Sequence, residues 1–127
     1  MVDVIVDTSV IIEKIRTNRG LFDKLIDKAK KGKVGLYTSA VVITELWMGQ
    51  GMKYKESVMG VEDLLESMRT ITIDREIGKK AGELIRGKQV EGFDALIAAS
   101  ALVLKFKLAT LNVKHFKKIK GLKLYNS

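Results

Sequence analysis

The chain has 127 residues, and 23 Lys and Arg against 15 Asp and Glu give a formal net charge of +8. This length, with 46% hydrophobic and 30% charged residues, predicts one globular domain over residues 1–127 and excludes a disordered chain. The absence of cysteine excludes disulfides, a thiolate nucleophile and zinc–sulfur sites. The longest apolar stretch, 95–104, falls well short of the roughly 20 residues that a bilayer requires, and we expect a cytoplasmic protein.

Short β-branched runs alternate along the chain with longer segments at helical spacing, which is typical of a parallel sheet covered by helices. Strands are predicted at 4–6, 34–38, 71–73 and 108–110, with a last possible strand at 122–125. Helices are predicted from Thr8 or Ser9, at 21–29, 40–48, 61–68 and 77–85, and from Asp94 onward, with a short segment at 115–119. The helix at 40–48 is apolar on nearly all sides, so we expect it to be largely buried. The fold class is α/β.

Three carboxylates stand where a purely structural interpretation would place an apolar residue. Asp7 ends a buried strand, at the sheet edge where ligands bind in parallel α/β folds, although taken alone it could equally cap the next helix. Glu45 lies in the apolar run AVVITELWMG, where an unpaired charge is costly. Asp94 begins another apolar helix and, taken alone, would be read as a cap.

Taken together, these carboxylates indicate a cation site. Three of them in one crevice would repel one another unless a cation held them, and ligation by oxygen alone favours Mg²⁺ or Mn²⁺. Such an ion activates water and neutralises charge on a phosphoryl oxygen, which predicts phosphodiester hydrolysis. Acid–base cleavage by two histidines and a Ser-His-Asp triad are disfavoured, because His115 is the only histidine. We interpret His115 as a structural residue or an RNA contact.

Positive charge is concentrated at the end of the chain, where residues 105–127 contain seven Lys and no Asp or Glu. Lysine contacts to phosphates provide most of the non-specific affinity for nucleic acid, so this segment suits RNA or DNA. An ordinary solvated face explains the same composition nearly as well.

Four segments resemble the successive motifs of PIN-domain proteins, most closely the VapC-type toxin ribonucleases: VDTSV, TELWMG, FDALIAASAL and LATLNVKHFKKIKGL. The resemblance spans the chain and is most specific from 92 to 122. It implies a three-layer α/β/α domain with a mostly parallel five-stranded sheet, and RNA cleavage that depends on Mg²⁺ or Mn²⁺. It also implies a homodimer and a VapB-type antitoxin, with Trp47 and Tyr54 as candidate contacts, although core packing is the simpler interpretation of Trp47.

Position by position, the resemblance assigns the metal ligands to Asp7, Glu45 and Asp94, with Ser9 binding a water of the metal. Many family members have Asp at a fourth position where this chain has Asn112. An amide in place of a carboxylate predicts weaker metal binding, although Asn112 could equally be only a turn former.

Several lysines follow Asn112 closely enough to flank the crevice and contact an RNA backbone, or else form an exposed basic turn: Lys114, Lys117 and Lys118. Glu91 is a possible substitute for the missing acid at the fourth position, with an exposed loop position as the alternative.

Two other functions stay open beside the toxin ribonuclease. One is a PIN-fold module that binds nucleic acid or protein with little catalysis, and the other is a housekeeping nuclease for RNA processing.

Overall fold

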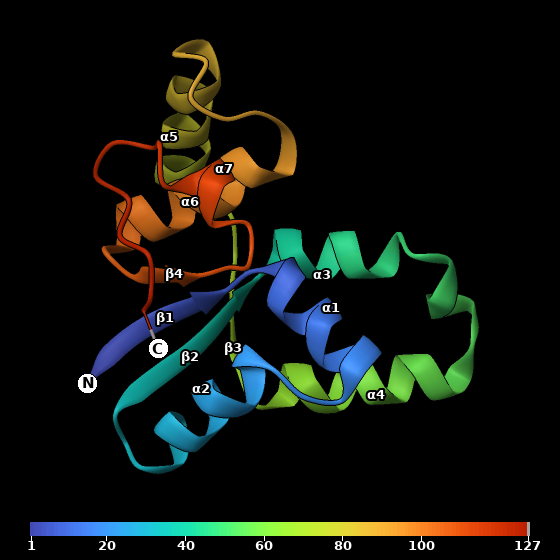
Figure 1. Ribbon diagram of the computed structural model, residues 1–127. Coiled ribbons are helices and arrows are strands. Elements are labelled where there is room, and N and C mark those ends of the chain that lie inside the picture. Colours follow the sequence, from blue (N-terminus) through green and yellow to red (C-terminus); the bar gives the residue numbers. More distant parts are fainter. Residues whose placement is uncertain (127) are drawn as a thin grey trace.

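The computed structural model describes residues 1–126, which form four short strands with helices between them (Figure 1). The strands are β1 (Val2–Val6), β2 (Val34–Ser39), β3 (Arg69–Ile71) and β4 (Lys107–Ala109). The α-helices are α1 (Thr8–Thr17), α2 (Leu21–Lys30), α3 (Ala40–Trp47), α4 (Lys55–Glu66), α5 (Arg75–Arg86), α6 (Gly92–Leu104) and α7 (Val113–Phe116), and a 3-10 turn, η1, spans Gln50–Lys53. The α/β class expected from the sequence is confirmed.

The four strands form one parallel sheet in the order β3-β2-β1-β4. The five-stranded sheet that we expected is therefore wrong by one strand. The chain after α7 returns to β4 but pairs with it only through an isolated bridge between Leu108 and Leu124. Two hydrogen bonds flank this bridge, from Leu108 N to Lys123 O at 2.9 Å and from Tyr125 N to Leu108 O at 2.8 Å. The pairing is too short to form a strand.

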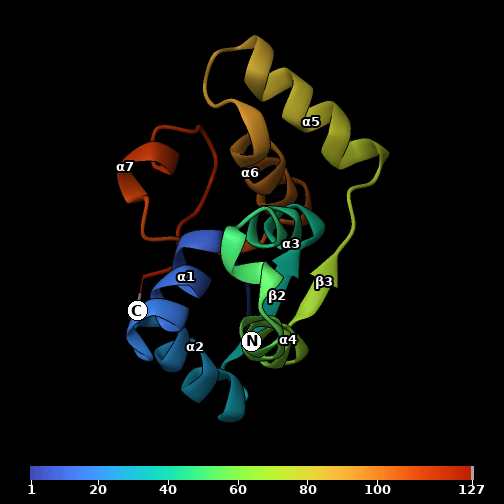
Figure 2. The same cartoon turned by 90° about the vertical axis from the view of Figure 1, so that its right-hand side faces the viewer.

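Helices cover both faces of the sheet, with α5, α6 and α7 on one side and α2 and α4 on the other (Figures 1 and 2). The central strand β1 is buried at Val4, Ile5 and Val6, as its apolar run predicts. The alanine-rich helix α6 is buried along most of its length and packs against α5. Among the helices of residues 1–126, none combines the length and apolarity that crossing a bilayer requires.

Helix α3 is less buried than expected. Val41, Val42 and Leu46 face the core, but Trp47 is 39% exposed and Met48 lies largely in solvent. The simpler interpretation of Trp47 as a core residue is therefore wrong. A run that is apolar throughout does not distinguish core positions from exposed ones, because it lacks the polar stripe that marks the outer face of a helix.

The parallel register places the first candidate side chain. Val6 pairs with Ala109, so the next residues of the two chains, Asp7 and Thr110, leave the sheet at the same edge. The neighbouring strand β2 ends at Ser39 and leads directly into α3, which carries Glu45. The ends of three adjacent segments thus meet at the carboxyl edge of the sheet, where ligands bind in open parallel sheets.

Candidate active site

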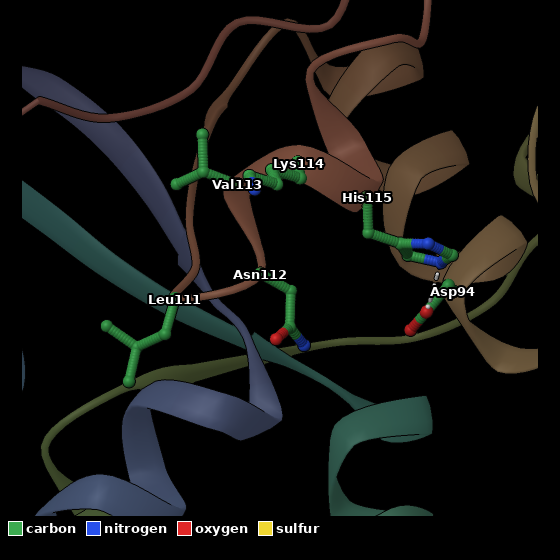
Figure 3. Close-up of a pocket in the computed structure, with 6 residues that line it drawn as sticks. All are labelled: Asp94, Leu111, Asn112, Val113, Lys114 and His115. Atoms are coloured by element: carbon green, nitrogen blue, oxygen red, sulfur yellow. Dashed lines mark ion pairs between the residues drawn. The ribbon is translucent and has the colours of Figure 1, made fainter.

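A hollow of about 640 Å³ opens at the carboxyl edge of the sheet, beneath α7, and its lining residues are Asp94, Leu111, Asn112, Val113, Lys114 and His115. Figure 3 shows that the carboxylate of Asp94 and the amide of Asn112 point toward the same space, whereas Leu111 points away from it. Residues from α6 and from the segment after β4 are thus brought together, although nearly twenty positions of sequence separate Asp94 from Asn112.

Asp7 is held by hydroxyl groups at this edge and does not cap α1. Its side chain is 3% exposed and makes no capping hydrogen bond, although it occupies the N-cap position. Its Oδ2 atom accepts hydrogen bonds from Thr110 Oγ1 at 2.7 Å and from Ser9 Oγ at 2.8 Å. Ser9 Oγ in turn accepts one from Leu111 N at 3.0 Å. These hydroxyls hold the carboxylate in place without bringing a positive charge beside it, and carboxylate oxygens are ligands that hard divalent cations prefer.

Glu45 projects from α3 toward the same edge. Thr8 Oγ1 donates a 3.0 Å hydrogen bond to Glu45 Oε1. Burial raises the pKa of Glu45, the bond from Thr8 opposes this effect, and the charges of Asp94 and Asp7 raise the pKa further. The carboxylates therefore lie close enough to repel one another.

Asp94 is the third residue of α6 and makes no capping bond, so its interpretation as a simple helix cap is not supported. Its Oδ2 atom lies 2.8 Å from Nε2 of His115, which is drawn as the dashed line in Figure 3. Burial and the charge of Asp7 raise the pKa of Asp94, while His115 lowers it. The net direction is upward, as for Glu45.

The charge of these three carboxylates is not compensated by lysine or arginine. Within residues 1–126, every ion pair to Lys or Arg involves other acids, and only His115 reaches one of the three. The same residues contain no group of three or more His, Asp or Glu close enough together to hold a metal ion. The donors are hard oxygens that repel one another, and they fit a divalent cation that keeps some of its own water ligands.

The remaining predicted residues fall into two groups. Asn112 and Lys114 line the hollow beside Asp94, and the Asn112 side chain makes no hydrogen bond to any residue of 1–126. Glu91 and Lys118 line a neighbouring groove, and Lys117 lines neither. Glu91 thus lies outside the hollow that contains Asp94.

Two contacts at the site were not predicted from the sequence, that of Thr110 with Asp7 and that of His115 with Asp94. Thr110 could have been identified from the pairing of β1 with β4, which places it beside Asp7. The contact of His115 with Asp94 depends on how α7 packs against α6, and no periodic pattern signals it. Phe116, fully buried next to His115 in a T-shaped arrangement of the two rings, anchors α7 in that position.

Residues 4–122 match the family model described as PIN domain. The chain belongs to the PIN-domain family. A curated relative of this PIN-domain chain is Ribonuclease VapC10 of Mycobacterium tuberculosis (strain H37Rv), which is 34% identical over 125 residues covering 94% of this chain and 90% of the relative.

Solved structures similar to this PIN-domain chain include toxin–antitoxin assemblies. VapBC2 from Rickettsia felis, bound to a DNA fragment from its promoter, has a TM-score of 0.85 at 24% identity, covering 98% of both chains. DNA-bound VapBC from Salmonella typhimurium has a TM-score of 0.80 at 20% identity, with 98% of both chains covered. At these identities the likeness shows the fold, and the three-layer PIN arrangement is confirmed.

Proposed function

We propose that this chain is a divalent-cation-dependent endoribonuclease and the toxin of a VapBC-type toxin–antitoxin pair. The proposal rests on three carboxylates from separate segments, Asp7, Glu45 and Asp94: the charge of Asp7 helps to raise the pKa of the other two, and within residues 1–126 none of the three pairs with Lys or Arg. The curated relative that aligns along nearly the whole chain is a ribonuclease, and this supports RNA as the substrate.

Asp7, Glu45, Asp94 and Asn112 would hold Mg²⁺ or Mn²⁺, directly or through water. When bound, such an ion supplies an activated water near neutral pH and neutralises the charge that develops on the phosphate. Asn112 contributes an amide oxygen in place of a carboxylate, so the site carries one negative charge fewer and favours a single ion.

The surrounding side chains orient these ligands. Thr110 and Ser9 fix Oδ2 of Asp7, which leaves Oδ1 for the ion. Thr8 restrains Glu45 in the same way. Lys114 lies in the hollow beside Asp94 and places a positive charge where an RNA phosphate would lie.

A second surface suits the antitoxin. A groove of about 300 Å³ between α1, α3, η1 and α4 is lined by Ile12, Ile15, Leu46 and Met52 and by Glu45. The exposed apolar side chains of Ile15, Trp47 and Tyr54 belong to the same elements or adjoin them. We assign this groove to an apolar segment of a VapB-type antitoxin, since the groove contains Glu45 and a basic antitoxin side chain there would neutralise the site.

Two further expectations belong to this proposal. The chain forms a homodimer, which sedimentation equilibrium of the purified protein measures directly. Its expression in cells arrests growth, and co-expression of a small protein encoded beside it restores growth. A housekeeping nuclease would show neither the arrest nor the rescue.

Cleavage of single-stranded RNA tests the catalytic proposal. The purified protein cuts RNA in Mn²⁺ or Mg²⁺ and loses this activity in EDTA. Asp94→Asn abolishes cutting and keeps the fold, because the amide oxygen still accepts the bond from His115. Asp27→Asn, an exposed carboxylate of α2 outside the hollow, is the matched control and leaves the activity unchanged.

Two results would contradict the assignment: cutting that persists in EDTA, or full activity of Asp94→Asn. The second candidate function is a module that binds nucleic acid or protein without cleavage. It is favoured by Asn112, which stands where many family members have Asp. In that case the protein binds RNA with strong salt dependence but binds no Mn²⁺ at millimolar concentration.

A further inference from the structure

A second groove continues from the hollow that contains Asp94. It encloses about 380 Å³ between the turn joining α5 to α6 and helix α7, and its lining residues are Ile85, Lys88, Gln89, Val90, Glu91, His115 and Lys118. His115 lines both cavities, so the two meet at this side chain. Their lining residues belong to α5, α6, α7 and the segments next to these helices, and Figure 2 shows the three helices at the same end of the molecule.

The groove carries excess positive charge. Lys88 and Lys118 are exposed and face one acid, Glu91, and none of these three forms an ion pair within residues 1–126. Lys114 adds a further positive charge in the adjoining hollow. On the other side of the site, the groove that contains Glu45 is mainly apolar and has Arg16 as its only basic residue. A polyanion that leaves the site is therefore attracted toward Lys88 and Lys118.

Lys88 occupies a backbone conformation that favours glycine. Its φ is 57°, and it closes the C-terminus of α5, with Lys88 N donating to Ile85 O at 3.0 Å and Gln89 N to Leu84 O at 3.1 Å. Glycine adopts this left-handed position without strain and is the usual residue there. The neighbouring Gly87 has a φ of −80°, which any residue adopts. A lysine is thus held at a strained position on the rim of the groove.

The two walls of the groove are joined to each other. Gln89 Oε1 accepts a 3.2 Å hydrogen bond from the backbone of Lys120, which follows α7. This bond ties the turn after α5 to the segment after α7, so the backbone segments that carry Lys88 and Lys118 are held together before a ligand binds. A preset spacing lowers the ordering cost of binding.

We propose that this groove holds the RNA backbone on one side of the cleaved bond, with Lys88 and Lys118 contacting phosphates. The inference rests on the proposed ribonuclease function and names the path of its substrate. His115 lies between the groove and the site, so its imidazole would lie beside the bound RNA.

Equilibrium binding in EDTA tests the path without cleavage, using a fluorescent single-stranded RNA of mixed sequence over a series of salt concentrations. One phosphate contact in single-stranded nucleic acid contributes about 0.7 to the slope of log K against log salt. Lys88→Gly therefore lowers the slope by about 0.7 and weakens binding about fivefold at 0.1 M salt. The same variant raises Tm, because glycine relieves the backbone strain.

Lys105→Gly is the matched control. Lys105 is exposed, has a φ of 61° and lies at the opposite end of α6 from Asp94, where it lines a different cavity. The control loses the same charge and relieves the same strain, so its Tm rises while RNA affinity stays at the wild-type value. Lys88→Gln removes the charge and retains the strained backbone, and it weakens binding as Lys88→Gly does.

Equal RNA affinity of Lys88→Gly and Lys105→Gly overturns the proposed path, as does a wild-type protein without measurable RNA affinity. A separate cleavage assay in Mn²⁺ distinguishes this failure from failure of the ribonuclease assignment. If wild-type protein cuts RNA and Lys88→Gly binds normally, only the path is wrong. If nothing is cut but Lys88→Gly selectively loses affinity, the groove stands and the catalytic assignment fails.

Discussion

Replacing Thr110 by Val tests the hydrogen bonds that hold Asp7 in place. Thr110 is 6% exposed, and its hydroxyl donates a 2.7 Å bond to a carboxylate that is itself 3% exposed. Valine keeps the shape of the side chain, but it leaves Asp7 with one donor fewer at a buried position and removes the acceptor of the 3.0 Å bond from Asn112 N. A hydrogen bond to a charged group contributes about 1.5–3 kcal/mol. Because Ser9 still donates to the same oxygen, we expect Thr110→Val to lower the free energy of unfolding by about 2 kcal/mol.

Thr38 provides the matched control within the same sheet. It lies in β2 with 0% exposure, and its hydroxyl has no hydrogen-bond partner within residues 1–126. Thr38→Val removes a buried polar group that makes no bond, and such a group costs about 1–3 kcal/mol. The same chemical change is therefore expected to stabilise the fold by about 1 kcal/mol.

Thermal unfolding in EDTA at pH 7, followed by circular dichroism, measures both changes. For a chain of this length 1 kcal/mol corresponds to a shift of roughly 4 °C, so Tm falls by about 8 °C for Thr110→Val and rises by about 4 °C for Thr38→Val. Equal Tm shifts of the same sign in the two variants would refute the reasoning. They would show that removing a hydroxyl that bonds Asp7 has the same effect on stability as removing one that makes no bond.

Two further predictions concern the site itself. Asn112→Asp restores a fourth carboxylate, so calorimetric titration with Mn²⁺ shows tighter binding, and weaker binding would place residue 112 outside the ligand set. Burial and the charges of Asp94 and Asp7 raise the pKa of Glu45 despite the bond from Thr8, so the folded form binds this proton more tightly than the unfolded form. The free energy of unfolding therefore falls as pH rises through the raised pKa. In EDTA, Glu45→Gln is stabilised relative to wild type more at pH 7 than at pH 4, and a constant difference in Tm would contradict this.

The sequence predicted most of the fold, because apolar runs and helical periodicity are local signals. The strand expected at 4–6 is confirmed as part of β1. Residues 1–126 form no fifth strand, because the chain after α7 pairs with β4 only at the bridge between Leu108 and Leu124. How that segment returns to the sheet depends on tertiary packing, which no local pattern signals. Trp47 was interpreted as a core residue, which was wrong because the burial of each face of an apolar helix depends on which elements pack against it.

The candidate site was predictable where a residue type conflicts with its surroundings. Asp7, Glu45 and Asp94 interrupt apolar segments, and a parallel sheet brings strand ends together. Their partners carry no such conflict: Thr110 is an ordinary strand residue, and His115 reaches Asp94 only because Phe116 anchors α7. Sequence reasoning therefore identified the charged groups and Ser9, but it missed the hydrogen bonds from Thr8 and Thr110 that orient Glu45 and Asp7.

An anomalous difference map from crystals soaked in Mn²⁺ tests the central claim most directly. The account predicts a peak between Asp7, Glu45 and Asp94, with oxygen ligands at about 2.2 Å and some of them water. A map at millimolar Mn²⁺ with no peak there, or with Asp94 bound only to His115 and the three carboxylates apart, would contradict it.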